Sequence, residues 1–142
     1  MNEMSEEVVI TATQVPTESR MDFLPNQFGR HYLLGEALVY GWLRQLSEDY
    51  TGGFWNFYTL SNGGFYIAPD ADQRFRVVVP TNWFEGELSA DAAGIVATIF
   101  ALGQLASEVD GTDADAICDA YHALCAFAGG HKEGGLIFRA ID

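Results

Sequence analysis

The sequence predicts an α+β fold: a single compact domain in which an antiparallel β-meander packs against several α-helices. Four short runs rich in β-branched and aromatic residues follow one another between residues 54 and 88, as in a meander. Helical periodicity precedes and follows these runs. No internal repeat or linker divides the 142 residues, so we expect one domain over 1–142, with residues 1–7 as a frayed tail.

The segment before the meander predicts one strand, one short helical turn and one long helix. Residues 8–15 are rich in β-branched side chains and favour a strand. The stretch FLPNQFGRH contains a proline and a glycine, so we expect a short helical turn and a break near Gly29. An amphipathic helix is expected over residues 30–46, because apolar residues recur every four positions at Leu34, Leu38, Trp42 and Leu46.

The four strands of the meander are expected at residues 54–60, 64–68, 75–79 and 83–88. Asn62-Gly63 lies between the first two runs and predicts a hairpin with a type I′ turn, because both residues tolerate positive φ. Short polar links join the remaining runs, which favours antiparallel neighbours.

Three helices are expected after the meander. Ser89 is a predicted N-cap for a helix over residues 92–109 that is apolar nearly all round. This stretch is interrupted and shorter than the roughly 20 residues of a membrane span, so we interpret it as a buried core helix. Thr112 is the predicted N-cap of the next helix, which Gly129-Gly130 ends, and residues 133–142 predict a short final helix.

Six aromatic residues between positions 54 and 66 allow two interpretations, a platform on which nucleic-acid bases stack or a sheet core. On strands they would lie on both faces, as in a sheet covered on both sides. A stacking platform is usually combined with a basic groove, and no Lys or Arg occurs between Arg44 and Arg74. The sheet core is therefore favoured. The aromatic residues are Phe54, Trp55, Phe57, Tyr58, Phe65 and Tyr66.

The chain is strongly acidic, with 20 Asp and Glu residues against 7 Lys and Arg residues and a formal net charge of −13. Because affinity for nucleic acid depends on neutralising phosphates, we expect no direct binding to nucleic acid. A protein with a positive DNA-binding channel would attract this chain, although acidity also simply keeps proteins soluble. The acidic N-terminus lacks the basic region of a secretory signal, so we expect a cytoplasmic protein without membrane contact.

Cys118, His122 and Cys125 fall on one side of a predicted helix and include zinc-ligand types, with His131 as the nearby candidate for a fourth ligand. Paired Cys-x-x-Cys elements are missing, so we expect two buried, reduced, metal-free thiols and no cofactor. The spacing of seven residues, about 10.5 Å along a helix, prevents a disulfide between them.

No motif of an enzyme active site is recognisable in the sequence. Glu85 and Glu87 share one strand face and resemble paired catalytic carboxylates, but a solvated face is the favoured interpretation. His31 is expected to have a capping or packing role.

Several long strings occur in an order that resembles the ArdB/KlcA family of antirestriction proteins. They include FLPNQFGRH, GEALVYGWLRQLSEDYTGGFWNFYTLSNGGFYIAPD, GELSADAAGIVATIFALGQLASE, YHALCAFAGGH and IFRAID. The resemblance covers roughly residues 20 to 142, without the loop around residues 71–76. It implies a protein of plasmids and other mobile elements that relieves type I restriction–modification, with an α+β fold and no cofactor. A compact fold differs from the elongated DNA mimics of another antirestriction family.

Relief of restriction could then take place by two mechanisms of binding or by one enzymatic alternative. The leading hypothesis is a non-enzymatic inhibitor that binds a type I restriction–modification enzyme or an associated host factor. The second is partial mimicry of DNA charge, and an enzyme acting on DNA or nucleotides is the third. The candidate partner-binding residues are Asp142 and Arg139 at the C-terminus and Glu108, Asp110, Asp113, Asp115 and Asp119 in the acid-rich segment.

Asp142 is the sharper candidate, because it carries its side-chain carboxylate and the main-chain carboxylate together. Ile137 and Ile141, one helical turn apart, would anchor this end, and the fixed charges would accept hydrogen bonds from a Lys or Arg of the partner. The alternatives are an internal ion pair with Arg139 or solvation.

Overall fold

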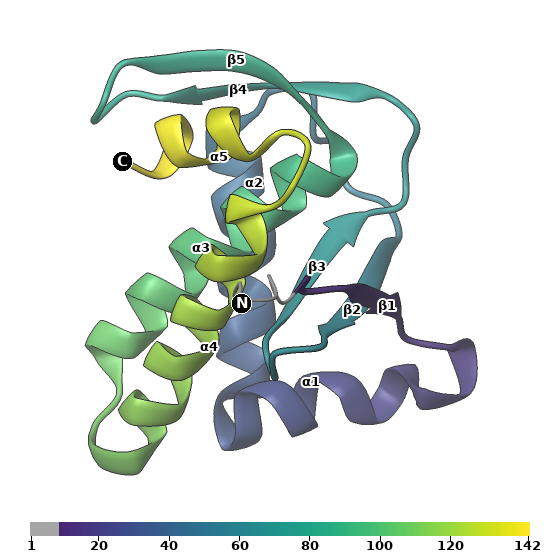
Figure 1. Ribbon diagram of the computed structural model, residues 1–142, viewed down its shortest axis with the longest axis vertical. Helices are drawn as coiled ribbons and strands as arrows, with labels where there is room; N and C mark the ends of the chain where they lie inside the picture. The colour runs from purple at the N-terminus through teal and green to yellow at the C-terminus, as the bar shows by residue number, and fades with distance from the viewer. Residues whose placement is uncertain (1–8) are drawn as a thin grey trace, which may run out of the picture.

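A three-stranded sheet with helices on both faces forms the centre of the computed structural model, which describes residues 9–142 (Figure 1). The expected frayed tail at residues 1–7 lies outside the described residues. The strands are β1 (Ala12–Gln14), β2 (Trp55–Leu60), β3 (Phe65–Pro69), β4 (Arg74–Val79) and β5 (Phe84–Ser89). The helices are α1 (Arg20–Phe28), α2 (Tyr32–Leu46), α3 (Ala90–Glu108), α4 (Gly111–Gly129) and α5 (Gly134–Ile141), with short 3-10 turns at Thr17–Ser19 and Gly29–His31. The predicted α+β class is confirmed.

The strands form two sheets instead of one continuous meander. β1, β2 and β3 pair antiparallel in that order, and β4 and β5 form a separate hairpin above them (Figure 1). Phe57 lies opposite Ile67 in the pairing of β2 with β3. The Phe57 carbonyl accepts from Val15 N at 2.8 Å and therefore points away from β3. The two residues are thus a non-hydrogen-bonded pair, in which the backbone groups of Ile67 face away from β2.

Helix α3 occupies the edge of β3 at which β4 would have paired. The Thr98 hydroxyl of α3 accepts from Ile67 N at 3.4 Å and lies 3.3 Å from the Ile67 carbonyl. Its proton is directed to that carbonyl or to the Gly94 carbonyl at 2.8 Å. A buried threonine therefore satisfies the backbone groups of Ile67 in β3, and the chain crosses residues 70–73 to begin a second sheet.

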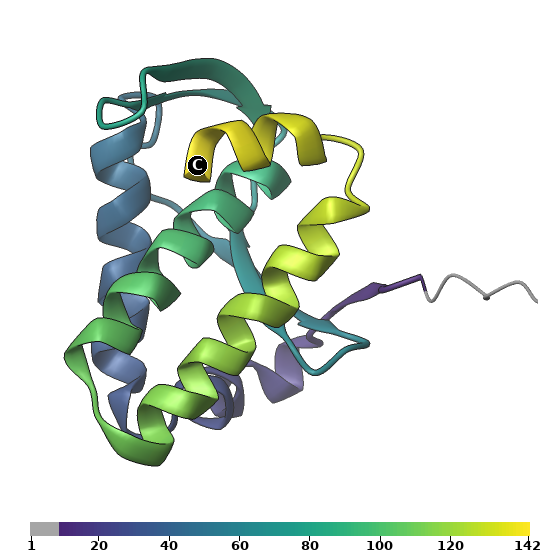
Figure 2. The same cartoon turned by 60° about the vertical axis from the view of Figure 1, so that its left-hand side comes forward.

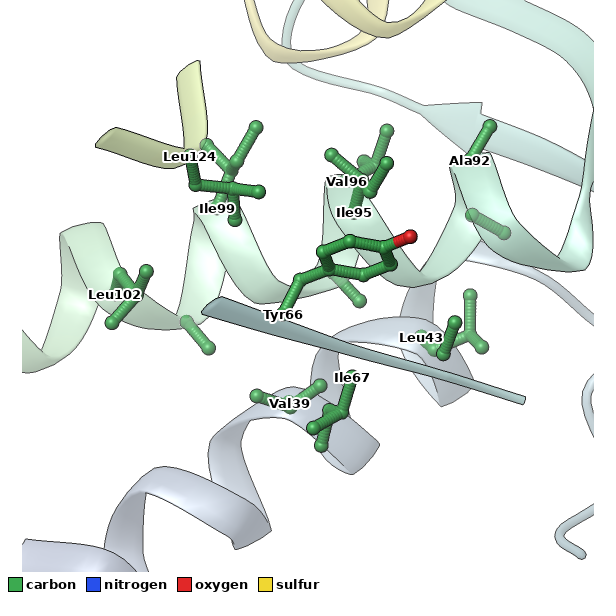
Figure 3. Packing of buried hydrophobic residues seen from close by; sticks show 14 of the residues in the cluster. Val39, Leu43, Tyr66, Ile67, Ala92, Ile95, Val96, Ile99, Leu102 and Leu124 are labelled. Carbon is green, nitrogen blue, oxygen red and sulfur yellow. The ribbon is translucent and has the colours of Figure 1, made fainter. Parts of the chain in front are cut away.

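The core lies on both faces of β3 (Figure 3). Ile67 faces Val39 and Leu43 of α2, whereas Tyr66 faces α3 and α4, against Ile95 and Leu124. All six of these side chains are almost fully excluded from solvent. Successive side chains of β3 point to opposite faces of the sheet, so this one strand packs against the helices of both layers.

The aromatic residues of β2 and β3 are mainly core residues, as predicted. Phe23 of α1 stacks on Phe57 with ring centroids 4.8 Å apart, and Tyr58 stacks on Tyr66 at 4.7 Å. Phe54 is the exception, because 63% of it is exposed beside the Arg20 guanidinium. The other rings are buried or, for Tyr58, half-buried, which excludes a continuous base-stacking platform.

Helix α3 begins at the predicted N-cap, since the Ser89 hydroxyl accepts from Ala92 N at 3.1 Å. It is the one described helix long and apolar enough to cross a membrane, and 67% of its most apolar stretch is buried inside the protein. The interpretation as a core helix is confirmed. The predicted N-cap Thr112 is wrong: Asp110 takes that position and the helix begins at Gly111, which has φ +63°.

The turn between β2 and β3 differs from the predicted type I′ turn. Gly63 has φ +89°, but Asn62 does not adopt positive φ. Gly63 N donates to the Leu60 carbonyl at 3.0 Å, and Leu60 N donates to the Gly64 carbonyl at 2.9 Å. The hairpin is therefore a three-residue loop, a turn followed by one residue with positive φ.

Helix α1 and strand β5 also differ in extent from the elements that the sequence predicted. The short turn expected around Pro25 is a nine-residue helix, α1, which ends as predicted at Gly29 with φ +59°. In the second sheet, β5 begins at Phe84, so Trp83 belongs to the turn and not to the predicted strand. Glu85 and Glu87 lie on the exposed face of β5, where they pair with Arg76 and Arg74 of β4.

Candidate partner-binding site

The sequence-predicted residues lie at two separate places on the protein. Arg139 and Asp142 end the chain beside the β4–β5 hairpin, whereas the acid-rich segment begins at the junction of α3 and α4 (Figure 2). Asp119 lies two residues before Tyr121, which lines a hollow beside Asp142, whereas Glu108 and Asp110 lie before the first residue of α4. The structure therefore does not combine all of the predicted residues into one site.

The acid-rich segment is exposed at Glu108, Asp110, Asp115 and Asp119. Asp113 differs, because its carboxylate lies 2.8 Å from Arg30 Nη2 and 3.1 Å from His31 Nε2. Hydrogen bonds from His31 and then Arg30 hold the pKa of Asp113 below its ordinary value. These contacts join the start of α4 to the segment between α1 and α2. His31 thus binds a carboxylate within the protein.

The C-terminal residues are held by both apolar and polar contacts. Ile137 is fully buried and Ile141 is half-buried, so α5 is anchored by the two positions that the sequence suggested. The Asn82 side chain in the β4–β5 turn donates to the Ala140 carbonyl at 2.8 Å. Asp142 remains exposed at the end of this fixed helix.

Arg139 does not neutralise Asp142 within the described residues, where no ion pair of 4.0 Å or less joins them. Its guanidinium lies 5.6 Å from the centre of the Phe84 ring. A surface hollow of about 520 Å³ lies beside Arg139 and Asp142. Its other lining residues are Tyr121, Cys125, Phe138 and Ile141, so charged groups border a mainly apolar surface.

A second polar cluster, which sequence reasoning missed, joins β3, α3 and the loop before α5. Tyr66 Oη donates to Asp91 at 2.7 Å, and His131 Nε2 donates to the other Asp91 oxygen at 2.8 Å. Glu133 N donates to His131 Nδ1 at 2.9 Å, which places the proton of the neutral ring on Nε2. Burial alone would raise the pKa of Asp91, but the hydrogen bonds from His131 and Tyr66 lower it.

Next to this cluster, Glu133 binds Ser89 and Arg74, and this arrangement differs from that of a catalytic triad. Glu133 accepts from both Ser89 N and Ser89 Oγ, and it lies 3.6 Å from Arg74 Nη2. Ser89 is therefore bonded to a carboxylate and not to a histidine base. Burial would raise the pKa of Glu133, whereas the bonds from Ser89 lower it. No local signal links these residues, because Tyr66, Asp91 and His131 are far apart in the sequence.

We expect Asp91→Asn to lower the melting temperature at neutral pH, because an amide leaves one of two partly buried donors without an acceptor, at a cost of about 1 kcal/mol. The pKa of Asp91 is lower in the folded protein than its ordinary 3.8, so this stabilisation is complete above that value and is lost as pH falls through the folded pKa. Thermal unfolding at pH 7 and pH 3 measures the effect, which should shrink at pH 3. Asp115→Asn is the exposed control, and equal effects of the two substitutions would contradict the prediction.

The two cysteines are less buried than expected: Cys118 is exposed and Cys125 is half-buried. Burial raises the pKa of the Cys125 thiol, partly offset by a hydrogen bond from Tyr121. His131, the proposed fourth ligand, is bonded to Asp91 instead. Among residues 9–142, no three His, Cys, Asp or Glu side chains form a group that could hold a metal ion. That the protein is metal-free stays a prediction.

Comparison with known proteins identifies relatives of this arrangement. A profile of the antirestriction protein family matches residues 48–142. Two Escherichia coli proteins named antirestriction protein KlcA are 59% identical, one over 135 residues (94% of this chain, 95% of the relative) and one over 137 residues (94% of each). A solved structure with 56% identity and a TM-score of 0.90 covers both chains completely. It was described for KlcA and ArdB proteins, with a novel fold and antirestriction activity against type I DNA restriction systems in vivo but not in vitro.

Proposed function

The chain belongs to the antirestriction protein family, and we propose that it relieves type I restriction–modification of incoming DNA by binding a protein. The observation that carries this proposal is the likeness over the whole chain, with a TM-score of 0.90 at 56% identity, to a structure described with activity against type I systems. Activity of those proteins in vivo but not in vitro fits a mechanism that needs a cellular component. The partner is then the type I enzyme or an associated host factor in the cytoplasm.

A binding mechanism also agrees with the polar chemistry of the described residues. The two polar groups that most resemble catalytic machinery, Ser89 and His131, are bonded to Glu133 and Asp91 within the fold. Asp142 is exposed on an anchored helix beside the 520 Å³ hollow. Fixed carboxylates next to apolar surface are suited to a partner that presents Lys or Arg.

Replacing Asp142 with Asn tests this binding site. We expect protection of unmodified phage DNA, measured as plating efficiency on cells with a type I enzyme, to fall about tenfold. That change corresponds to 1.4 kcal/mol of lost binding free energy. The protein should accumulate and melt as the wild type does, because Asp142 is exposed. Asp115→Asn, which removes an exposed carboxylate near the start of α4, is the matched control. Wild-type protection by Asp142→Asn would remove this residue from the site.

Partial charge mimicry is the second candidate, supported by the exposed carboxylates near the α3–α4 junction. Neutralising Glu108, Asp110, Asp115 and Asp119 together should abolish protection under this mechanism and leave it intact under the first. A mimic would also lose affinity steeply as salt increases.

Neither mechanism requires the protein to bind DNA. With a net charge of −13, we expect no shift of duplex DNA in a gel assay at physiological salt. Sub-micromolar, salt-sensitive binding would contradict both mechanisms and favour direct action on DNA.

A further inference from the structure

Trp83 has an unusual position in the turn between β4 and β5. It is 91% exposed, and it is the one non-glycine residue with positive φ, +64°, among residues 9–142. Bulky residues rarely adopt this backbone conformation, for which glycine is preferred. The indole gains no burial in return. Strained, exposed residues of this kind are typical of sites selected for contact with another molecule.

The turn that carries Trp83 is fixed to the C-terminal helix. Asn82 N donates to the Val79 carbonyl at 3.3 Å, and the Asn82 side-chain oxygen accepts from Phe84 N at 3.0 Å. The amide of the same side chain donates to the carbonyls of Ala140 at 2.8 Å and Arg139 at 3.4 Å. One asparagine therefore holds the turn in shape and joins it to the end of α5.

These hydrogen bonds bring the turn that carries Trp83 close to Asp142. Asn82 precedes Trp83 directly, and Ala140, its hydrogen-bond partner, lies two residues before Asp142. Figures 1 and 2 show the β4–β5 turn beside the C-terminus in both views. Trp83 and Asp142 thus lie next to residues that the same hydrogen bonds hold together.

We propose that Trp83 and Asp142 form a two-point docking surface for a protein partner. The indole enters an apolar pocket of that partner, and a Lys or Arg at the rim of the pocket donates to the side-chain carboxylate of Asp142. This inference rests on the proposed function, since it describes how the partner of that function is bound. Tryptophan is enriched among the few residues that dominate binding energy at protein interfaces, and its fixed backbone reduces the ordering that binding requires.

Charge identifies the partner as a protein with a basic rim. A single exposed indole also suits stacking on a nucleobase, but a phosphate backbone would then approach the carboxylate of Asp142 on a chain of net charge −13. An anionic membrane surface would be repelled in the same way. A basic protein surface is attracted by both the local and the overall charge.

Trp83→Gly tests the proposal without loss of a packing contact, because glycine is suited to φ +64°. We expect its melting temperature to equal that of the wild type or exceed it by a few degrees. Plating of unmodified phage on cells with a type I enzyme should nevertheless show at least a tenfold loss of protection. Trp83→Phe should protect better than Trp83→Gly. Met21→Ala is the control, because Met21 is also 90% exposed but belongs to α1.

A double substitution measures whether the two residues contact the same partner. If they do, Trp83→Gly with Asp142→Asn should lose less protection than the product of the two single losses. Wild-type protection by Trp83→Gly, or an equal loss in Met21→Ala, would overturn the docking surface while leaving the proposed function in place. Absence of protection by the wild-type protein would overturn both.

Discussion

Replacing Gly94 with alanine is expected to destabilise the protein by about 3 kcal/mol, the upper end of the usual effect of overpacking. Gly94 lies in the first half of α3, where the helix crosses β3. A Cβ atom at this position would lie 2.4 Å from the Cα and Cβ atoms of Ala68 and 2.5 Å from the Ile67 carbonyl oxygen. Two of these are backbone atoms, so no change of side-chain rotamer relieves the contact. The helix and the sheet would have to separate.

The separation would also weaken the contact between Thr98 and β3, because Thr98 lies one helical turn after Gly94. Urea unfolding of Gly94→Ala and wild type measures the difference in free energy. Gly41→Ala is a matched control in α2, since Gly41 is exposed and a Cβ there would meet no atom within 4 Å. That control should stabilise the protein by about 0.5–1 kcal/mol. Equal stability of Gly94→Ala and wild type would show that α3 does not approach β3 so closely.

Replacing Gly63 with valine should destabilise the protein by about 2 kcal/mol, for a conformational and not a steric reason. Gly63 has φ +89°, a region that β-branched residues resist, although a Cβ would meet no atom within 4 Å. The hairpin would have to change its turn or shift its register, and Phe65 and Tyr66 follow directly in the buried strand.

Thermal unfolding of Gly63→Val and Gly63→Asn separates the two explanations. Asparagine tolerates positive φ, so the Gly63→Asn protein should retain most of the wild-type stability even though this substitution also adds a side chain. A large loss with Asn as well as with Val would indicate a steric effect, contrary to the open space around Gly63.

Elements that depend on neighbouring residues could be predicted from the sequence. Ser89 caps α3 as expected, and the apolar repeat of residues 30–46 corresponds closely to α2. The hairpin at Gly63 was also predicted, but the turn type was not, because one residue and not two adopts positive φ. Local preference identifies where a chain turns more readily than how it turns.

Features that depend on distant residues could not be predicted in this way. The division of the strands into two sheets follows from Thr98, which lies about 30 residues after the strand edge that it occupies. The pairing of Asp113 with Arg30 joins residues that are 83 positions apart in the sequence. Asp142 and Arg139 were recognisable as charged ends of a helix, whereas the neighbouring Trp83 was assigned to a strand because aromatic residues favour strands. Its place beside Asp142 depends on a hydrogen bond from Asn82 to α5.

The contact between Thr98 and β3 also affects how copies of the chain associate with one another. Sheet edges with unpaired backbone groups recruit strands from other molecules, which leads to strand exchange and fibrous aggregates. β3 is a fully buried apolar strand and would be a hazardous edge if it were open. The threonine hydroxyl ends the sheet from within the same molecule, at the position of Ile67. One buried polar side chain of α3 thereby covers a backbone edge of the first sheet that would otherwise be open to another strand.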